Sequence, residues 1–397
     1  MIVAASSRTL LAARYGSRWL LPSLTCGEGT RAAPVVARWC AGRGLASDVA
    51  GQWLGRVSGN ATDWLMVLVA QPERAHEAGP LEWIPLDAAV SSESIIEYQT
   101  WALSRVLECA ALPTVAGPFG NLQWPEAART WIGESFGCSV YAWTPYRVSA
   151  HEVVFGTETS RGRVYFKGLA GDRAAEGTMT RAFAAAAPES FARTLALQVN
   201  DRASVWWLTG HCEGRPTRDA LQVAAALAPI QQRFASLAAD LPGLKPLDLP
   251  TAVEWACEGL DSSAIAAIRE AAFRVMQSSM PRTWIPMDLD PTNVLSGEDG
   301  VRFIDVDESF IGPAPLAMAV FARRCGGANG YRRYQDAWSP PLVNVDWTSV
   351  EIASAVFGAW RGWQRVKTNV ERGEVHAALD VVSARIHERL ARTIYRR

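Results

Sequence analysis

Two apolar runs, each ending in a polar side chain, constrain this chain of 397 residues more than any other feature. The first run covers residues 284–287 and leads into a short segment that carries Asp288 and, five positions later, Asn293. The second consists of Val301, Phe303 and Ile304, is interrupted by Arg302, and ends at Asp305. Short apolar runs between turn residues are typical of buried strands. We therefore expect a strand, a short loop and a hairpin, so that two carboxylates and one amide converge.

These three side chains match the needs of phosphoryl transfer from a nucleotide, in which one carboxylate holds the acceptor hydroxyl and other oxygens hold magnesium. We interpret Asp288 as the group that takes the hydroxyl proton, a role worth about 10²–10⁴-fold in rate. Asn293 and Asp305 offer the oxygen ligands that Mg2+ prefers. The apolar approach to Asp305 also favours a cation partner, because a buried carboxylate without one is costly. Taken alone, Asp288 is better explained as a turn cap ahead of Pro291, so the interpretation depends on the whole set.

Lys167 ends a Val-Tyr-Phe-Lys strand, where its ammonium could neutralise the α and β phosphates of a nucleotide. That role needs an acidic side chain to hold the lysine. Glu176, in the first turn of the helix expected at 174–187, is the candidate, and Glu189 is a weaker rival. No Gly-rich phosphate loop is found, because residues 156–162 indicate only a flexible turn.

Composition limits the class of protein. The length predicts two or three domains. The net charge of −1 gives no electrostatic basis for binding nucleic acid or an anionic membrane. The seven cysteines form no CxxC pair, which is typical of reduced thiols. No uncharged apolar run reaches the length of a membrane span. We expect a cytoplasmic protein with no nucleic-acid or membrane partner, and the oligomeric state stays open.

The pattern along the chain predicts three domains. Residues 1–115 are strand-rich with a helix and form a small α+β domain. A Pro- and Gly-containing linker at 112–124 follows. Residues 124–213 open with a helix and continue as strands, whereas residues 214–397 are mostly helical. The last two domains together have the layout of a sheet-rich lobe and a larger helical lobe.

The chain resembles the aminoglycoside phosphotransferase family, the small-molecule branch of the protein-kinase-like fold. The family's His-Gly-Asp-x-x-x-x-Asn loop is similar to residues 286–293, and its Ile-Asp strand end and Gly-Pro stretch are similar to 303–305 and 311–313. Residues 164–167 resemble its lysine strand, and the resemblance covers roughly residues 125–397. It implies a bilobal fold of the α+β class that uses ATP and Mg2+ to phosphorylate a small-molecule hydroxyl acceptor. It also implies the site residues: Asp288 as base, Asn293 and Asp305 as metal ligands, and Lys167 with Glu176 at the phosphates of ATP.

One departure from the family concerns the loop itself. Pro286 and Met287 stand where the family has His and Gly. The family's His steadies the loop through hydrogen bonds that a proline cannot donate. We expect an altered or slower kinase, and the alternative is a catalytically impaired pseudokinase that acts as a nucleotide-binding or regulatory module. No cluster of acidic residues indicates a polycationic acceptor, so the acceptor stays open.

The first domain faintly resembles a Nudix-type fold, in which residues 81–87 are similar to the closing segment. A Nudix catalytic box needs a cluster of Glu residues on one helix, and residues 48–59 contain none. We therefore expect a degenerate Nudix-like domain that serves binding, regulation or an interface.

A rival interpretation begins at Asp305. The pattern Asp305-x-Asp307-x-Ser309 after a strand resembles the nucleophile motif of haloacid-dehalogenase-type phosphatases, whose first Asp becomes phosphorylated. In that fold the motif opens a βα core, whereas here the residues that follow are mostly helical. It would also leave Asp288 and Asn293 unexplained.

Overall fold

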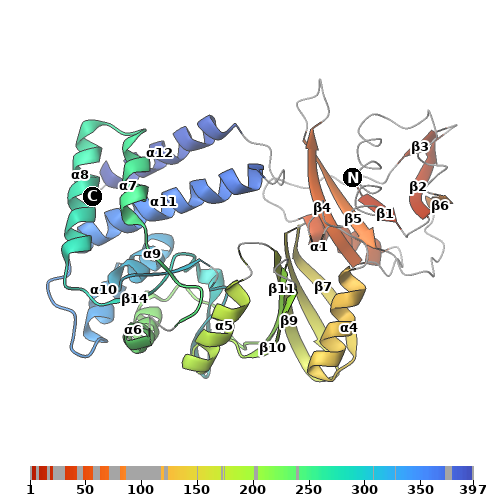
Figure 1. Ribbon diagram of the computed structural model, residues 1–397, viewed down its shortest axis with the longest axis horizontal. Helices are drawn as coiled ribbons and strands as arrows, with labels where there is room; N and C mark the ends of the chain where they lie inside the picture. Colours follow the sequence, from red (N-terminus) through yellow and green to blue (C-terminus); the bar gives the residue numbers. More distant parts are fainter. Residues whose placement is uncertain are drawn as a thin grey trace. The chain divides into compact units, whose positions relative to one another are not determined.

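The structure of the protein is a computed structural model, shown in Figure 1. It describes the helix at 32–42, the backbone of six strands between residues 2 and 85, and most of the chain from residue 124 onward. The described segments after residue 85 are 118–119, 124–149, 151–170, 173, 175–200, 204–237, 241–306, 308–326, 328–371 and 378–395. They form two compact units. The first contains the described residues of Met1–Ala174 and Leu195–His211, and the second those of Ala175–Thr194, Cys212–Glu371 and Ala377–Arg397.

A six-stranded mixed sheet begins the first unit, with the order β3-β2-β1-β5-β4 and with β6 paired to β2. Strands β1 and β5 are parallel, and the other pairs are antiparallel. Strands β2 and β3 pair with Tyr15 opposite Arg18. The segment searched for a Nudix helix forms a strand, and the Nudix-like resemblance stays a prediction. The bounds are β1 Ile2–Ala5, β2 Thr9–Tyr15, β3 Arg18–Leu20, α1 Ala32–Ala41, β4 Asp48–Arg56, β5 Asp63–Ala70 and β6 Leu81–Pro85.

A five-stranded antiparallel sheet of order β10-β11-β9-β8-β7 completes the first unit together with helix α4. Pro125 lies in the first turn of α4, where its missing N–H leaves no gap in the hydrogen bonds. Aromatic side chains from the helix and the sheet form the core, as in the stacked pair of Trp143 and Phe155, whose ring centroids lie 4.4 Å apart. The bounds are α4 Trp124–Phe136, β7 Val140–Val148, β8 Glu152–Thr159, β9 Gly162–Ala170, β10 Thr194–Asn200 and β11 Ser204–Gly210.

The structure differs from the sequence-based expectations at the turn of residues 156–162 and in the linker. Strand β7 ends at Val148 and β8 begins at Glu152, so residues 148–155 do not form one continuous strand. The turn expected at 156–162 is shorter, because Gly156 is inside β8, where a Cβ would lie 2.8 Å from the Tyr146 ring. Gly156 is therefore needed for a close side-chain contact rather than for a bend. Phe119 of the predicted linker is fully buried.

Helices dominate the second unit, and two small three-stranded sheets of order β12-β15-β16 and β13-β17-β14 lie among them. The helix predicted at 174–187 is confirmed as α5, and the mostly helical character predicted for residues 214–397 is confirmed in their described part. The helices are α5 Ala175–Ala186, α6 Ala220–Leu237, α7 Leu249–Cys257, α8 Ser262–Gln277, α9 Pro315–Cys325, α10 Gly330–Asp336, α11 Trp347–Glu371 and α12 Leu379–Tyr395. The strands are β12 Arg215–Pro216, β13 Lys245–Pro246, β14 Arg282–Pro286, β15 Val294–Gly297, β16 Gly300–Phe303 and β17 Ser309–Pro313.

The α+β class predicted from the sequence is confirmed, because antiparallel sheets and helices are largely segregated along the chain. The sheet expected in the smaller lobe lies in the first unit, and the helices expected in the larger lobe lie in the second. Helix α5, which we assigned to the smaller lobe, belongs to the second unit. Among the described helices, none combines the length and apolar character needed to cross a membrane. The cytoplasmic location stays a prediction.

One buried glutamine joins the elements around the loop that follows β14. The Gln231 amide on α6 donates to the carbonyl oxygen of Trp284 on β14 at 2.7 Å and to that of Ala314 at 3.2 Å. Its side-chain oxygen accepts a hydrogen bond from the Tyr334 hydroxyl, and its backbone oxygen accepts one from Thr283 at 2.6 Å. Because buried polar groups need partners, this side chain fixes β14 against α6 and α10.

The Gln231→Leu variant is expected to be destabilised, because it leaves two carbonyls and one hydroxyl without their partner. Each buried group left unpaired costs about 1–3 kcal/mol. Urea unfolding measures the loss. Gln277→Leu, at the exposed end of α8, is the matched control and should stay within about 0.5 kcal/mol of the wild type. Equal stabilities of the two variants would contradict this role for Gln231.

Candidate active site

The loop after β14 is held by its own backbone hydrogen bonds. Asp290 N–H donates to the Asp288 carbonyl at 2.8 Å, and Asn293 N–H donates to the Asp290 carbonyl at 2.8 Å. The Asp290 carboxylate accepts from the N–H and hydroxyl of Thr292 at 2.9 and 2.7 Å, so that it caps the short 3-10 turn Pro291–Asn293. The polar run of the sequence therefore forms a compact loop with a defined place for each side chain.

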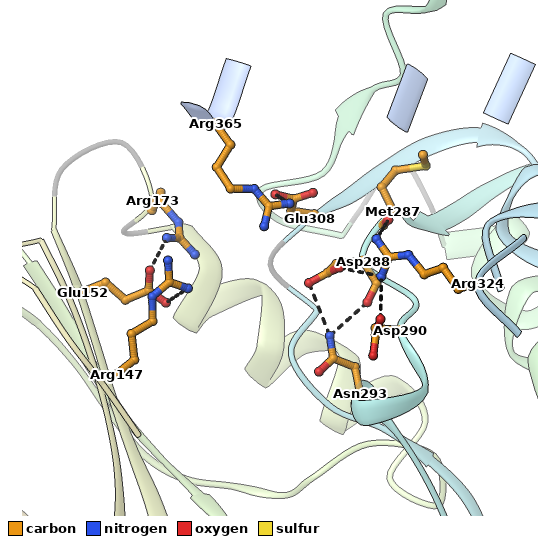
Figure 2. A network of polar contacts seen from close by, with 10 residues as sticks. All are labelled: Arg147, Glu152, Arg173, Met287, Asp288, Asp290, Asn293, Glu308, Arg324 and Arg365. Carbon is orange, nitrogen blue, oxygen red and sulfur yellow. Dashed lines mark hydrogen bonds and ion pairs between the residues drawn. The ribbon is translucent and has the colours of Figure 1, made fainter. Parts of the chain in front are cut away.

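Asp288 and Asn293, predicted to act together, are in contact. The Asn293 amide nitrogen lies 3.0 Å from the Asp288 carbonyl oxygen and 3.4 Å from Asp288 Oδ2 (Figure 2). With its nitrogen turned toward Asp288, the amide presents its oxygen in the opposite direction. Among the described residues none donates a hydrogen bond to that oxygen. An amide oxygen without a donor is suited to a hard cation.

The hairpin expected between Asn293 and Asp305 is confirmed. Strands β15 and β16 pair from Val294 with Phe303 to Gly297 with Gly300. Gly300 has a φ of 106°, which favours glycine at this turn. At the open end, Ile304 N–H donates to the Asn293 carbonyl at 2.9 Å, and Asp305 is the next residue. The hairpin thus brings together the backbones of the two predicted metal ligands.

Asp305 has an unusual backbone. Its φ is 59°, in the left-handed region that costs non-glycine residues energy, although Asp tolerates it better than most. Such conformations cluster at functional sites, where the surrounding structure holds them. Its side chain is exposed, so our inference of a cation partner from burial is wrong for this residue. Its place beside Asn293 is the remaining reason to assign it to a metal.

Arg324 of α9 contacts this loop, and the sequence did not reveal that contact. Its guanidinium, on the last turn of α9, donates to Asp288 Oδ1 at 2.7 Å and lies 3.5 Å from Asp290 Oδ2. Burial acts to raise the pKa of Asp290. The hydrogen bonds from Thr292 and the charges of Arg324 and Arg218 outweigh it, so this pKa lies below its usual range. Arginine near a helix C-terminus is common, and no sequence signal showed where this one points.

A second support of the loop comes from the segment that follows Asp305. Met287 N–H donates to the Glu308 carbonyl at 2.7 Å. The Glu308 carboxylate is in turn held by Arg365 of α11 at 2.8 Å (Figure 2). The start of the loop is therefore fixed by strand-like pairing that continues the ladder of β14 with β17.

The two predicted phosphate-binding residues lie in different units, so their pairing stays a prediction. Lys167 lies in β9, opposite Val154 of β8 and Trp207 of β11. Its ammonium is 5.6 Å from the centre of the Trp207 ring, a cation–π distance. Glu176 is buried in the first turn of α5.

Glu152 is a buried carboxylate on the sheet that sequence reasoning missed. It forms ion pairs with Arg147 at 3.0 Å and with Arg173 at 2.7 Å (Figure 2). Burial acts to raise the pKa of Glu152, but the charges of Arg147, Arg173 and Lys167 outweigh it and hold this pKa below its ordinary value. A glutamate at the start of a strand carries no sequence signal for such a cluster.

The Glu152→Gln variant is expected to destabilise the protein at neutral pH by about 1–3 kcal/mol. This is less than for a fully buried ion pair, because both arginines reach water. The pKa of Glu152 is lower in the folded protein than its ordinary value of 4.5. Glu152 therefore stabilises the fold at pH values above 4.5, and this stabilisation is lost as the pH falls through the pKa of the folded protein. Urea unfolding of both proteins should therefore give a stability difference that shrinks in acid.

The control is Glu158→Gln, on the same strand β8 as Glu152, which removes an exposed ion pair with Arg163 of β9. We expect little change from this variant at any pH. If the difference in unfolding free energy between wild type and Glu152→Gln were the same at pH 7 and in acid, Glu152 would not stabilise the fold through its charge.

The metal assignment can be compared with the donors present. Within the described part of the chain, no three His, Cys, Asp or Glu side chains gather at metal-binding distance. Magnesium does not require such a cage, because it usually takes one or two protein oxygens and completes its shell with phosphate and water. The Asn293 amide oxygen and the exposed Asp305 carboxylate at one hairpin end fit that requirement.

The phosphatase alternative is contradicted by the strands around Asp305. Strand β16 belongs to the three-stranded sheet β12-β15-β16 and pairs antiparallel with β15. The dehalogenase-type motif would instead follow a strand of a parallel, Rossmann-like sheet. Asp307, the second residue of that motif, lies outside the described residues.

Comparisons with known proteins give similarities at the level of structure. Neither a protein-family model nor a curated protein matches the chain. A thermostable mutant of aminoglycoside phosphotransferase APH(4)-Ia is 14% identical over 68% of this chain and 98% of its own, with a TM-score of 0.45. Choline kinase LicA from Streptococcus pneumoniae is 12% identical over 69% of this chain and 100% of its own, with a TM-score of 0.49.

Macrolide 2'-phosphotransferase MphH from Brachybacterium faecium is 10% identical over 68% of this chain and 97% of its own, with a TM-score of 0.48. All three are small-molecule kinases or phosphotransferases by name, the kind of protein that the sequence resembles. At these identities and TM-scores the similarity carries no conclusion about function, and the function proposed below rests on the residues of this chain.

Proposed function

We propose that this protein is an ATP-dependent phosphotransferase that transfers the γ-phosphoryl group of ATP to a hydroxyl of a small molecule. The observation that carries the proposal is the arrangement of the loop and hairpin. The Asn293 amide contacts Asp288, and the β15–β16 hairpin brings Asp305 beside Asn293. A base and two oxygen ligands in one place are what phosphoryl transfer needs from a protein.

Each residue has a defined part in this proposal. The Asp288 carboxylate accepts the hydrogen bond of the acceptor hydroxyl, orients it and takes its proton. The Asn293 oxygen and the Asp305 carboxylate hold Mg2+, which when bound neutralises charge on the phosphate oxygens. Lys167, with Glu176, is assigned to the phosphates of ATP.

A second candidate is a module that binds nucleotide without turnover. Two observations favour it: Pro286 and Met287 depart from the family loop, and both oxygens of Asp288 have a neighbouring donor, Arg324 at 2.7 Å and Asn293 at 3.4 Å. A carboxylate oxygen has two lone pairs, so one such contact still leaves room for a substrate hydroxyl. For this reason we place the enzyme first.

Incubation of the purified protein with ATP, Mg2+ and a panel of sugars, amino alcohols and aminoglycosides tests the proposal. The expected result is a phosphorylated acceptor formed in equal amount to ADP, seen by mass spectrometry. Tight ATP binding without product across the panel would support the nucleotide-binding module instead. Borohydride trapping of an aspartyl phosphate formed from a phosphate ester would support a phosphatase and contradict the kinase.

A further inference from the structure

Arg324 contacts the catalytic loop at three places. Its guanidinium donates to Asp288 Oδ1 at 2.7 Å, lies 3.5 Å from Asp290 Oδ2, and lies 3.5 Å from the Met287 carbonyl oxygen. The first of these has the length of a charge-assisted hydrogen bond. The planar guanidinium, with five N–H donors, can serve several acceptors at once, whereas a lysine ammonium is a point charge.

The helix that carries Arg324 is a rigid support. Residues 315–322 of α9 are all buried, so packing holds the helix on every side. The helix ends at Gly326, whose φ of 69° closes the last turn through a hydrogen bond to the Ala322 carbonyl. A side chain on such an element can keep another group within the small tolerance that a reactive geometry needs.

The two oxygens of Asp288 are in different situations. Oδ1 accepts the short bond from Arg324, whereas the one contact of Oδ2 among the described residues is the long one of 3.4 Å with the Asn293 amide. Oδ1 is therefore the anchored atom, and Oδ2 is the one with capacity to accept a substrate hydroxyl.

We infer that Arg324 is the positioning residue of this site: it holds Asp288 through Oδ1 so that Oδ2 faces the acceptor hydroxyl. The inference rests on the proposed phosphotransferase function. Pro286, the last residue of β14, can donate no backbone hydrogen bond, and Arg324 supplies support to the same loop from another helix. The contact joins residues 36 positions apart, so it depends on the packing of α9 beneath the loop.

Steady-state kinetics of Arg324→Lys and Arg324→Ala test the inference. Misplacing a reactive group by about 1 Å costs about 10²-fold in rate, so kcat should fall by that order in Arg324→Ala and by less in Arg324→Lys. The KM for ATP should change by less than about twofold, because the side-chain contacts of Arg324 with described residues are all with the loop. Millimolar methylguanidinium should restore part of the kcat of Arg324→Ala. Arg332→Gln, on an arginine whose side chain is 94% exposed, is the matched control and should keep the wild-type kcat.

A readout independent of turnover is the double-mutant cycle of Arg324→Ala and Asp288→Asn in thermal unfolding. Contact between the two side chains predicts that the losses in Tm are not additive. Additive losses, or an unchanged kcat in Arg324→Ala, overturn the positioning role while leaving the phosphotransferase in place. Absence of any turnover by the wild type overturns both proposals, so the two failures can be told apart.

Discussion

Asp288→Asn is expected to lower kcat by about 10²–10⁴-fold while ATP affinity stays nearly that of the wild type. The substitution keeps the size of the side chain but removes the proton acceptor. Asp288→Ala should have the same effect on transfer. Rapid-quench or steady-state kinetics give kcat, and calorimetric titration with a nonhydrolysable ATP analogue gives the affinity.

The matched control for this prediction is Asp336→Asn. Asp336 is an exposed residue of α10, and it forms only a long ion pair of 3.9 Å with Arg332. We expect wild-type kinetics from it. If Asp288→Asn keeps the wild-type kcat, then Asp288 is a turn cap, as its position before Pro291 also allows.

Asp305→Ala should abolish Mg2+-dependent turnover and, unlike the Asp288 variants, weaken the binding of the metal–nucleotide complex. The physical reason is the loss of the only charged ligand that we assign to the ion. A titration of rate against Mg2+ and a calorimetric titration of the ATP analogue with and without Mg2+ measure the two effects. Asp299→Asn, in the exposed turn of the same hairpin, is the matched control and should keep both values.

Asp305→Gly separates this chemical role from a structural one. Glycine adopts the φ of 59° without strain, so the variant should fold at least as stably as the wild type. Turnover should nevertheless be lost. A folded Asp305→Gly protein with wild-type turnover and wild-type Mg2+ dependence would exclude Asp305 as a ligand.

The part of the site that could be predicted from the sequence is the part fixed by local chain geometry. Asp288, Asn293 and Asp305 follow short apolar strands and flank a hairpin with a glycine at its turn, and such patterns depend on neighbours in the chain. Arg324 could not be predicted in the same way, because its contact with Asp288 depends on how α9 packs.

The sequence pattern gave a wrong prediction at Gly156 and at Asp305 and no prediction at Glu152, because each depends on contacts that form only in the folded protein. Gly156 suggested a turn, but it is a strand residue that makes room for the Tyr146 ring, and that contact exists only after β7 and β8 pair. The apolar approach to Asp305 suggested a buried carboxylate, yet the chain turns into the left-handed region there and the side chain is exposed. Glu152 gave no signal because its two arginine partners come from a neighbouring strand and from a later loop. Local sequence patterns therefore do not specify which side chains from distant elements become partners.

The most direct measurement is the transfer of label from γ-labelled ATP to small-molecule hydroxyls in the presence of Mg2+, with wild type and Asp288→Asn side by side. We predict a labelled acceptor with the wild type and labelling slower by about 10²-fold or more with the variant, although both bind ATP. Equal labelling by the two proteins, or none by a wild type that binds ATP, would contradict this prediction.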